Sequence, residues 1–108
     1  MRTYVRDLAG IAGSRFERAV RGRDLFLAET AAFEMSELSL VNALALVVLY
    51  AEAKDDKFER AGVRWLGKLL TERPMPIALA ARSAELVSEL RGPDAERAAH
   101  ALESLARP

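Results

Sequence analysis

The sequence contains no cysteine and only one histidine, His100. A disulfide framework, a thiolate metal site and a cysteine nucleophile are therefore excluded, and one imidazole offers little material for acid–base chemistry. A di-iron helical bundle needs Glu-x-x-His pairs, whereas Glu96 lies one residue too far from His100. No glycine-rich phosphate loop and no nucleophile elbow occur. We therefore expect no enzyme activity, no metal, no cofactor and no small-molecule substrate.

Long apolar runs and an excess of one charge are also missing. The longest apolar run is nine residues, 43–51, whereas a helix that crosses a bilayer needs about 20. Arg6 and Asp7 interrupt the segment that would be apolar in a signal peptide. Sixteen basic residues balance sixteen acidic ones, which is not typical of a dedicated nucleic-acid-binding protein. We expect a cytoplasmic protein without a membrane segment.

Alanine and leucine are abundant and make up about a third of the 108 residues, while proline and glycine are few. This composition has high helix propensity and predicts an all-α fold, either a small bundle or a short array of about six helices. The length predicts one domain, 1–108, with 1–13 as a flexible or loosely packed segment. Glycines, prolines and polar clusters mark the breaks. The predicted helices cover residues 2–8, which form a short and weak helix, and 14–21, 25–35, 40–53, 57–72, 76–91 and 94–105.

The predicted helix at 40–53 is apolar on nearly every side. For a soluble chain this pattern predicts a central helix, with residues 43–51 almost inaccessible. The helix at 57–72 is instead two-faced and is expected to lie across the central one. Asp24 is expected to cap the helix at 25–35, and Asp55 or Asp56 the helix at 57–72.

Three segments that follow a polar turn suggest a weak internal repeat, 24–28, 57–61 and 94–98. Their alanines align, and the intervals of 33 and 37 residues fall in the range of tetratricopeptide and HEAT hairpins. The full consensus of either repeat is absent, so an irregular helical bundle is the favoured alternative. The aligned alanines are Ala28, Ala61 and Ala98.

Four short segments carry a resemblance to a known family: ALALV at 43–47, AEA at 51–53, FERA at 58–61 and VRWL at 63–66. The chain resembles small all-helical proteins of actinobacteria, an uncharacterised family with no known activity. The resemblance covers about residues 25–90, and the excess of arginine over lysine suits such a GC-rich source. The resemblance implies a helical fold but no particular reaction or ligand.

Charge is unevenly distributed along the chain. Residues 1–23 hold six basic and two acidic groups, 24–56 one and seven, and 57–73 five and two. The favoured interpretation is that neighbouring helices of opposite charge attract one another across solvent-exposed faces. Each exposed ion pair then contributes under about 1 kcal/mol. The alternative is a phosphate-binding stripe on one helix, because four basic side chains fall within about 80° of each other on a helical wheel. These are Lys57, Arg60, Arg64 and Lys68.

Trp65 is the only tryptophan. Its place beside the apolar face of its helix favours a core role, with an interface anchor as the alternative. If the Tyr50 ring is buried, its hydroxyl needs a partner, for which Arg64 or Lys54 is in reach. The candidate partner-binding residues are Lys57, Arg60, Arg64, Trp65 and Lys68.

The favoured function is a non-catalytic protein–protein interaction or self-association module. The helices that begin near residues 40, 57 and 77 carry more large apolar side chains than one face each can hide, which predicts a homodimer through an apolar helix surface. The alternative is a small nucleic-acid-associated regulator, in which the basic helices at 15–23 and 57–68 converge on one face. Neutral net charge speaks against it.

Overall fold

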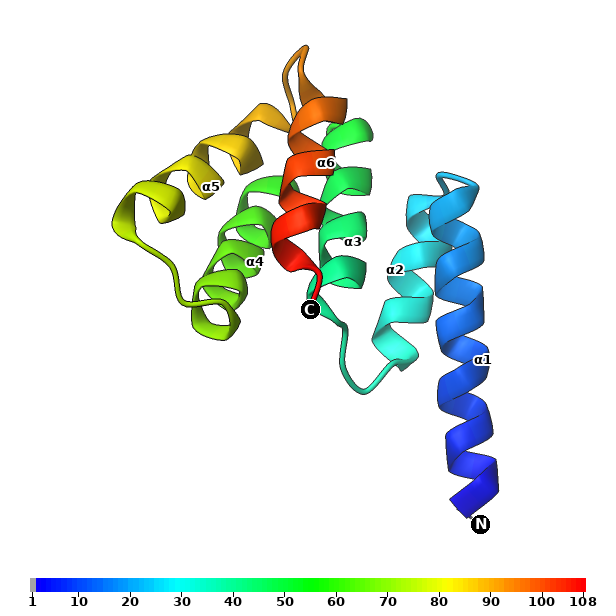
Figure 1. Ribbon diagram of the computed structural model, residues 1–108. Helices are drawn as coiled ribbons and strands as arrows, with labels where there is room; N and C mark the ends of the chain where they lie inside the picture. Colours follow the sequence, from blue (N-terminus) through cyan, green and yellow to red (C-terminus); the bar gives the residue numbers. More distant parts are fainter. Residues whose placement is uncertain (1) are drawn as a thin grey trace. The chain divides into compact units, whose positions relative to one another are not determined.

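The computed structural model describes the backbone of residues 2–108 and the side chains of residues 10–108. Over this range the chain forms six helices and no strand (Figure 1), which confirms the predicted all-α class. The chain divides into two compact units, Met1–Ser39 and Leu40–Pro108, called unit 1 and unit 2 below. The expected single domain over 1–108 stays a prediction, because two compact units can still unfold as one cooperative system.

Unit 1 is a helical hairpin of α1 (Arg2–Arg21) and α2 (Leu25–Glu34). The predicted break between residues 8 and 14 is wrong, since α1 continues through Gly10 and Gly13. Each glycine costs a helix about 1 kcal/mol relative to alanine. Burial of Ala12, Phe16 and Ala19 offsets that cost. The expected loose packing of 1–13 stays a prediction, because the side chains up to residue 9 lie outside the described part of the chain.

The turn between α1 and α2 has a left-handed residue, Arg23, with φ 55°. The amide of Gly22 donates to the carbonyl of Arg18, and the amide of Asp24 donates to the carbonyl of Ala19. These bonds satisfy carbonyls at the end of α1 that have no helical partner. The Asp24 carboxylate then accepts from the amide of Leu27 at 3.0 Å, which confirms the predicted cap of α2.

The same turn recurs between α3 (Leu40–Glu52) and α4 (Phe58–Glu72). Lys54 has φ 54°, and the amides of Ala53 and Asp55 donate to the carbonyls of Leu49 and Tyr50. The Asp55 carboxylate accepts from the amide of Lys57 at 2.8 Å. Two hairpins are therefore joined by the same local backbone geometry, although two further residues precede the second helix in this turn.

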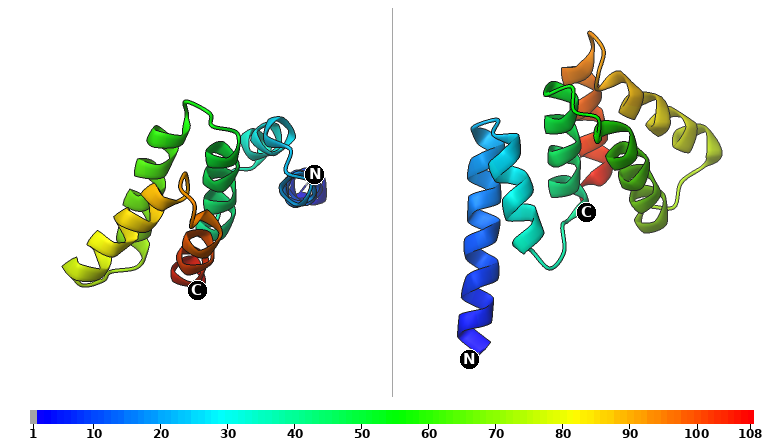
Figure 2. Two further views of the ribbon diagram at one scale, coloured as in Figure 1. Left: turned by 90° about the horizontal axis from the view of Figure 1, so that it is seen from above. Right: turned by 180° about the vertical axis from the view of Figure 1, so that it is seen from behind.

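Unit 2 is a ring of four helices, completed by α5 (Ile77–Glu89) and α6 (Ala95–Ala106). Each helix makes its main contacts with two others, because α3 packs on α4, α4 on α5, α5 on α6 and α6 on α3. Figure 2 shows α3 and α6 side by side in both of its views, although they are far apart in sequence. The contact between α3 and α6 closes the ring, so unit 2 is a small bundle and not an open array of hairpins.

The core of unit 2 centres on α3, whose buried side chains include Leu44, Val47 and Leu49. The prediction that 43–51 is almost inaccessible on every face is wrong for Ala43, Ala45, Leu46 and Val48, which are half-buried. A helix in a four-membered ring is covered by two neighbours in that ring and not by three or four, which accounts for the partial exposure. The predicted contact of the two-faced α4 with α3 is confirmed.

Candidate functional site

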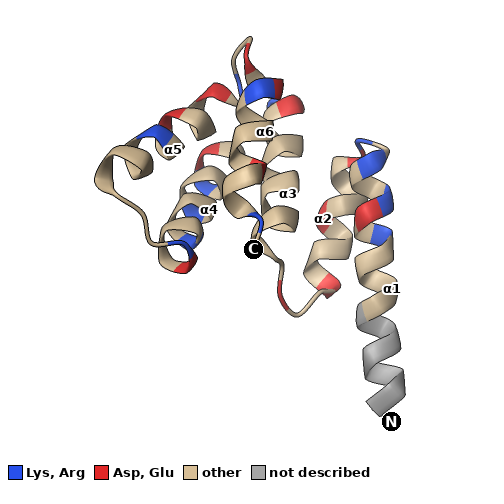
Figure 3. Ribbon diagram, in the orientation of Figure 1, with Lys and Arg blue, Asp and Glu red and all other residues tan. Residues whose placement is uncertain are grey.

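The basic stripe predicted on the fourth helix lies as expected along α4 and the residue before it. Lys57, Arg60 and Arg64 are exposed, and Lys68 is half-buried. Lys68 pairs with Glu72 one turn further along at 3.4 Å, and the Lys57 ammonium lies 6.0 Å from the centre of the Tyr50 ring. Figure 3 shows basic positions along α4 in blue. Two of the four cations are therefore engaged locally.

Arg60 and Arg64 are the members of the stripe without a hydrogen bond or ion pair in the described part of the chain. The same face of α4 carries the apolar Val63, which is 70% exposed. Gly67 follows on this face, and a methyl group placed on it would meet open space. The stripe is therefore a mixed surface with two available guanidinium groups, and not a continuous basic track.

Trp65 lies in the core of unit 2 and is 2% exposed. Its indole N–H donates to the carbonyl of Leu40 at 2.9 Å, which fastens α4 to the first residue of α3. Tyr50 is also buried, and the described residues include no buried side-chain polar atom without a partner. The core interpretation of Trp65 is the one that the structure supports, and the indole offers no surface to a partner.

Attraction between differently charged helices occurs where Arg15 of α1 pairs with Glu34 of α2. Arg91, before α6, also pairs with Glu59 of α4 at 3.6 Å and stacks 5.2 Å from the centre of the Phe58 ring. The Arg15–Glu34 pair joins the basic block 1–23 to the acidic block 24–56 in the way that the favoured interpretation predicts. All four charged groups are about half exposed or more, so each pair contributes under about 1 kcal/mol.

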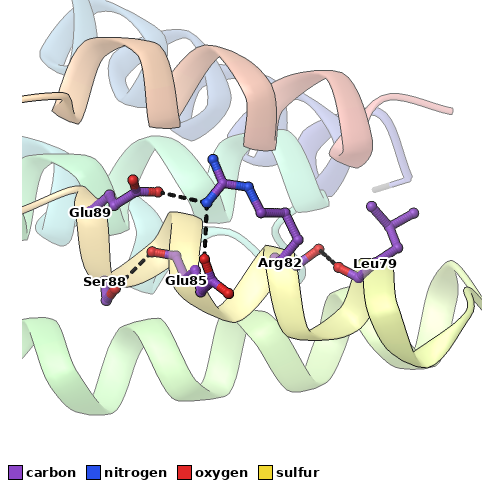
Figure 4. Close-up of polar contacts among 6 residues, drawn as sticks. Leu79, Arg82, Glu85, Ser88 and Glu89 are labelled. Atoms are coloured by element: carbon purple, nitrogen blue, oxygen red, sulfur yellow. Dashed lines mark hydrogen bonds and ion pairs between the residues drawn. The ribbon is translucent and has the colours of Figure 1, made fainter.

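The most extended charged network lies on α5 and is shown in Figure 4. Arg82 donates to Glu85 at 3.1 Å and to Glu89 at 3.4 Å. The hydroxyl of Ser88 donates to the carbonyl of Glu85 at 2.7 Å. All of these contacts lie within one helix and join partly exposed side chains, so the network stabilises α5 locally.

Metal-ligating side chains do not gather in the described residues, where no three of His, Cys, Asp and Glu lie close enough to hold an ion. His100 is exposed on α6. No helix in this part of the chain is both long and apolar enough to cross a bilayer.

The most exposed aromatic surface of the described residues lies on α2. Phe26 is 74% and Phe33 is 88% exposed. They are seven residues apart, which places them within about 20° of each other and about 10 Å apart along the helix axis. Ala28 and Ala31, which are buried, lie on the opposite side of α2. The two rings therefore point away from α1 and leave an apolar face without a partner in unit 1.

Polar groups beside this face are already satisfied. Thr30 lies between the two rings, and its hydroxyl donates to the carbonyl of Phe26 at 2.9 Å. Glu34, at the end of α2, is paired with Arg15. We call Phe26, Thr30 and Phe33 the α2 aromatic face. It can be covered by an apolar surface without leaving a hydroxyl unpaired, which would cost about 1–3 kcal/mol.

A groove with a volume of about 370 Å³ runs beside the α2 aromatic face, between α1 and α2. Leu27 lies in it and is 53% exposed. The groove thus extends the apolar surface of α2 toward the basic side of α1. Its lining residues are Arg15, Arg18, Ala19, Gly22, Asp24, Leu27, Thr30 and Ala31.

Sequence reasoning missed the α2 aromatic face and placed the surplus apolar surface on later helices. Those helices do expose Val63 and Ile77, but the two most exposed phenylalanines lie on α2. The available signal was Leu25, Phe26 and Leu27 in a row. Three consecutive residues spread over about 200° of a helix, so they cannot all face one neighbour.

Comparison of the chain with protein-family models, with curated proteins and with solved structures found no match. The resemblance to small helical proteins of actinobacteria therefore stays a prediction.

Proposed function

We propose that this protein is a non-catalytic interaction module that binds another protein, or a second copy of itself, through the side of α2 that faces away from α1. The observation that carries the proposal is the exposure of Phe26 and Phe33 on one side of α2. Large exposed apolar patches are uncommon on soluble monomers and usually mark a partner site. Aromatic side chains are also the residue type most enriched in the energetic centre of protein interfaces. The cytoplasm, which the cysteine-free sequence favours, is part of this proposal.

A retention experiment with the tagged full-length chain tests the proposal at physiological salt. The bait is offered a cell lysate together with an untagged copy of the chain. The native protein is compared with a Phe26→Ser, Phe33→Ser variant, which removes both rings from an exposed face. The control is Val63→Ser with Ile77→Ser, which removes two exposed apolar side chains from unit 2.

We expect the native chain and the control to retain the same proteins, and the variant without the two phenylalanines to lose them. Retention that is equal for all three chains would show that the α2 aromatic face binds nothing. Circular dichroism of the purified variants checks that each keeps its helices. Exposed sites of this kind usually change stability by less than about 0.5 kcal/mol.

A nucleic-acid-associated function is the second candidate, because Arg60 and Arg64 are exposed and have no ion-pair partner in the described residues. Two guanidinium groups one turn apart can contact neighbouring phosphates. The other basic block, 15–23, has Arg15 already engaged by Glu34. The net charge of zero disfavours phosphate binding, so this candidate ranks below protein binding.

A further inference from the structure

We infer that the partner of the α2 aromatic face is a second copy of this chain, and that the two α2 helices pair antiparallel about a two-fold axis beside Thr30. This inference rests on the proposed function and names its partner. It follows from the spacing of the exposed rings, from the area that they expose and from the charge at the two ends of α2.

The α2 aromatic face is complementary to itself. Two rings lie seven residues apart, and Glu29 and the smaller Thr30 lie on either side of the midpoint between them. When α2 is turned through 180° about an axis near Thr30, Phe26 of one copy meets Phe33 of the other, and the same contact forms twice. Threonine at the axis allows the helix axes to approach to about 8–10 Å. Its hydroxyl is already bonded to the carbonyl of Phe26, so the contact leaves it satisfied.

The exposed area suits a weak dimer. An aromatic side chain presents about 200 Å², so Phe26 and Phe33, at 74% and 88% exposure, present about 300 Å² together, or about 600 Å² for two copies. Leu27 lies in the groove between α1 and α2 and is left out of this area. Apolar atoms form about two-thirds of a homodimer interface. The total is then about 900 Å², in the range of weak and transient interfaces.

Charge favours the antiparallel orientation. The N-terminal end of α2 follows Arg21 and Arg23, and its C-terminal end is followed by Glu37, whereas Glu34 is already paired with Arg15. Antiparallel pairing places the basic end of one copy beside the acidic end of the other, whereas parallel pairing places like charges together. The helix dipoles of two antiparallel helices also attract each other.

Single-cysteine cross-linking tests the register, because the natural chain has no cysteine that would compete. In a Thr30→Cys variant the two sulfurs lie next to the axis, so mild oxidation is expected to give mostly covalent dimer on a non-reducing gel. The control is Thr71→Cys. Thr71 is also exposed, and its hydroxyl also donates to the carbonyl four residues earlier, at 2.9 Å. Formation of covalent dimer at equal rates by the two variants would overturn the register.

Light scattering over a hundredfold range of concentration tests the dimer itself. We expect the mass of the native protein to rise from one chain to two in the micromolar range, and the Phe33→Ser variant to stay at one chain. Val63→Ser, at an apolar site on α4 that is 70% exposed, is expected to dimerise like the native protein. A native mass that stays at one chain at the highest concentration would overturn the inference.

Charge exchange tests the orientation. Arg21→Glu is expected to weaken the dimer severalfold, and Arg21→Glu with Glu37→Arg to restore it; failure to restore would refute the antiparallel pairing.

The outcomes separate this inference from the proposed function. If the native chain is monomeric but retains a lysate protein that the variant without Phe26 and Phe33 loses, the proposed function stands and the second copy is not the partner. If the chain is monomeric and nothing is lost with the two rings, both fail.

Discussion

The same substitution, glycine to alanine, can be made at two positions of α4 that have different surroundings, Gly62 and Gly67. A methyl group added at Gly67 meets nothing within 4 Å, whereas one added at Gly62 lies 3.1 Å from Cγ1 of Val87 on α5. Alanine is better than glycine in a helix interior by about 0.8–1.0 kcal/mol. Gly67→Ala should therefore raise the free energy of unfolding by about 1 kcal/mol, which corresponds to about 4 °C in Tm for a chain of this size.

At Gly62 the same gain in helix propensity is opposed by crowding. Gly62 is buried where α4 packs on α5, and overpacking a well-filled site costs about 1–3 kcal/mol. We expect Gly62→Ala to lower the free energy of unfolding by up to about 2 kcal/mol. In a Val87→Ala background, which removes Cγ1, the loss should disappear, and the coupling between the two sites should reach about 1 kcal/mol.

Urea unfolding of the single and double variants, followed by circular dichroism, measures each of these changes. Equal shifts for Gly62→Ala and Gly67→Ala would refute the close approach of α4 and α5 on which the reasoning depends. A loss at Gly62 that persists without Cγ1 of Val87 would do the same.

Three further predictions concern the turns, the folding unit and the basic helices. Lys54→Gly should stabilise the chain by about 1 kcal/mol in thermal unfolding, because a left-handed φ strains every residue with a Cβ, while Lys54→Ala should bring no such gain. Trp65 fluorescence reports on unit 2, and far-ultraviolet circular dichroism reports on all helices. Both should give the same unfolding midpoint, because the 39 residues of unit 1 are about the lower limit for a domain that folds alone. Separate midpoints would show two domains. Labelled DNA and RNA should show no submicromolar binding by anisotropy at physiological salt; such binding, lost in an Arg60→Ala, Arg64→Ala variant, would promote the nucleic-acid function.

The helices were predictable where local chemistry decides their ends. Asp24 caps α2 as expected, and Pro76 precedes α5, because such residues act through their own backbone neighbourhood. The break predicted in α1 failed for the complementary reason. Gly10 and Gly13 weaken a helix locally, but the burial of Phe16 and its neighbours against α2 is a tertiary effect that no window of α1 contains.

The candidate site was less predictable than the fold. The exposure of Arg60 and Arg64 followed from helical spacing, and the core role of Trp65 followed from its place beside an apolar face. Phe26 and Phe33 were missed because α2 is apolar on several sides. Their exposure depends on which side of α2 is covered by α1. The spacing of the apolar residues in α2 does not predict where a neighbouring helix packs.

The ring of unit 2 closes only when α6 meets α3, and this order has a consequence for synthesis. The chain grows from its N-terminus at about 5–20 residues per second, so α6 follows α3 by roughly 3 to 10 seconds. Throughout that interval α3 can gain α4 and then α5, but the flank that α6 will cover stays open to water and to other nascent chains. We therefore expect chaperones to bind mainly to nascent chains in which α3 through α5 have left the ribosome and α6 has not. Slowing translation between residues 52 and 95 should lengthen the time for which this flank of α3 is exposed.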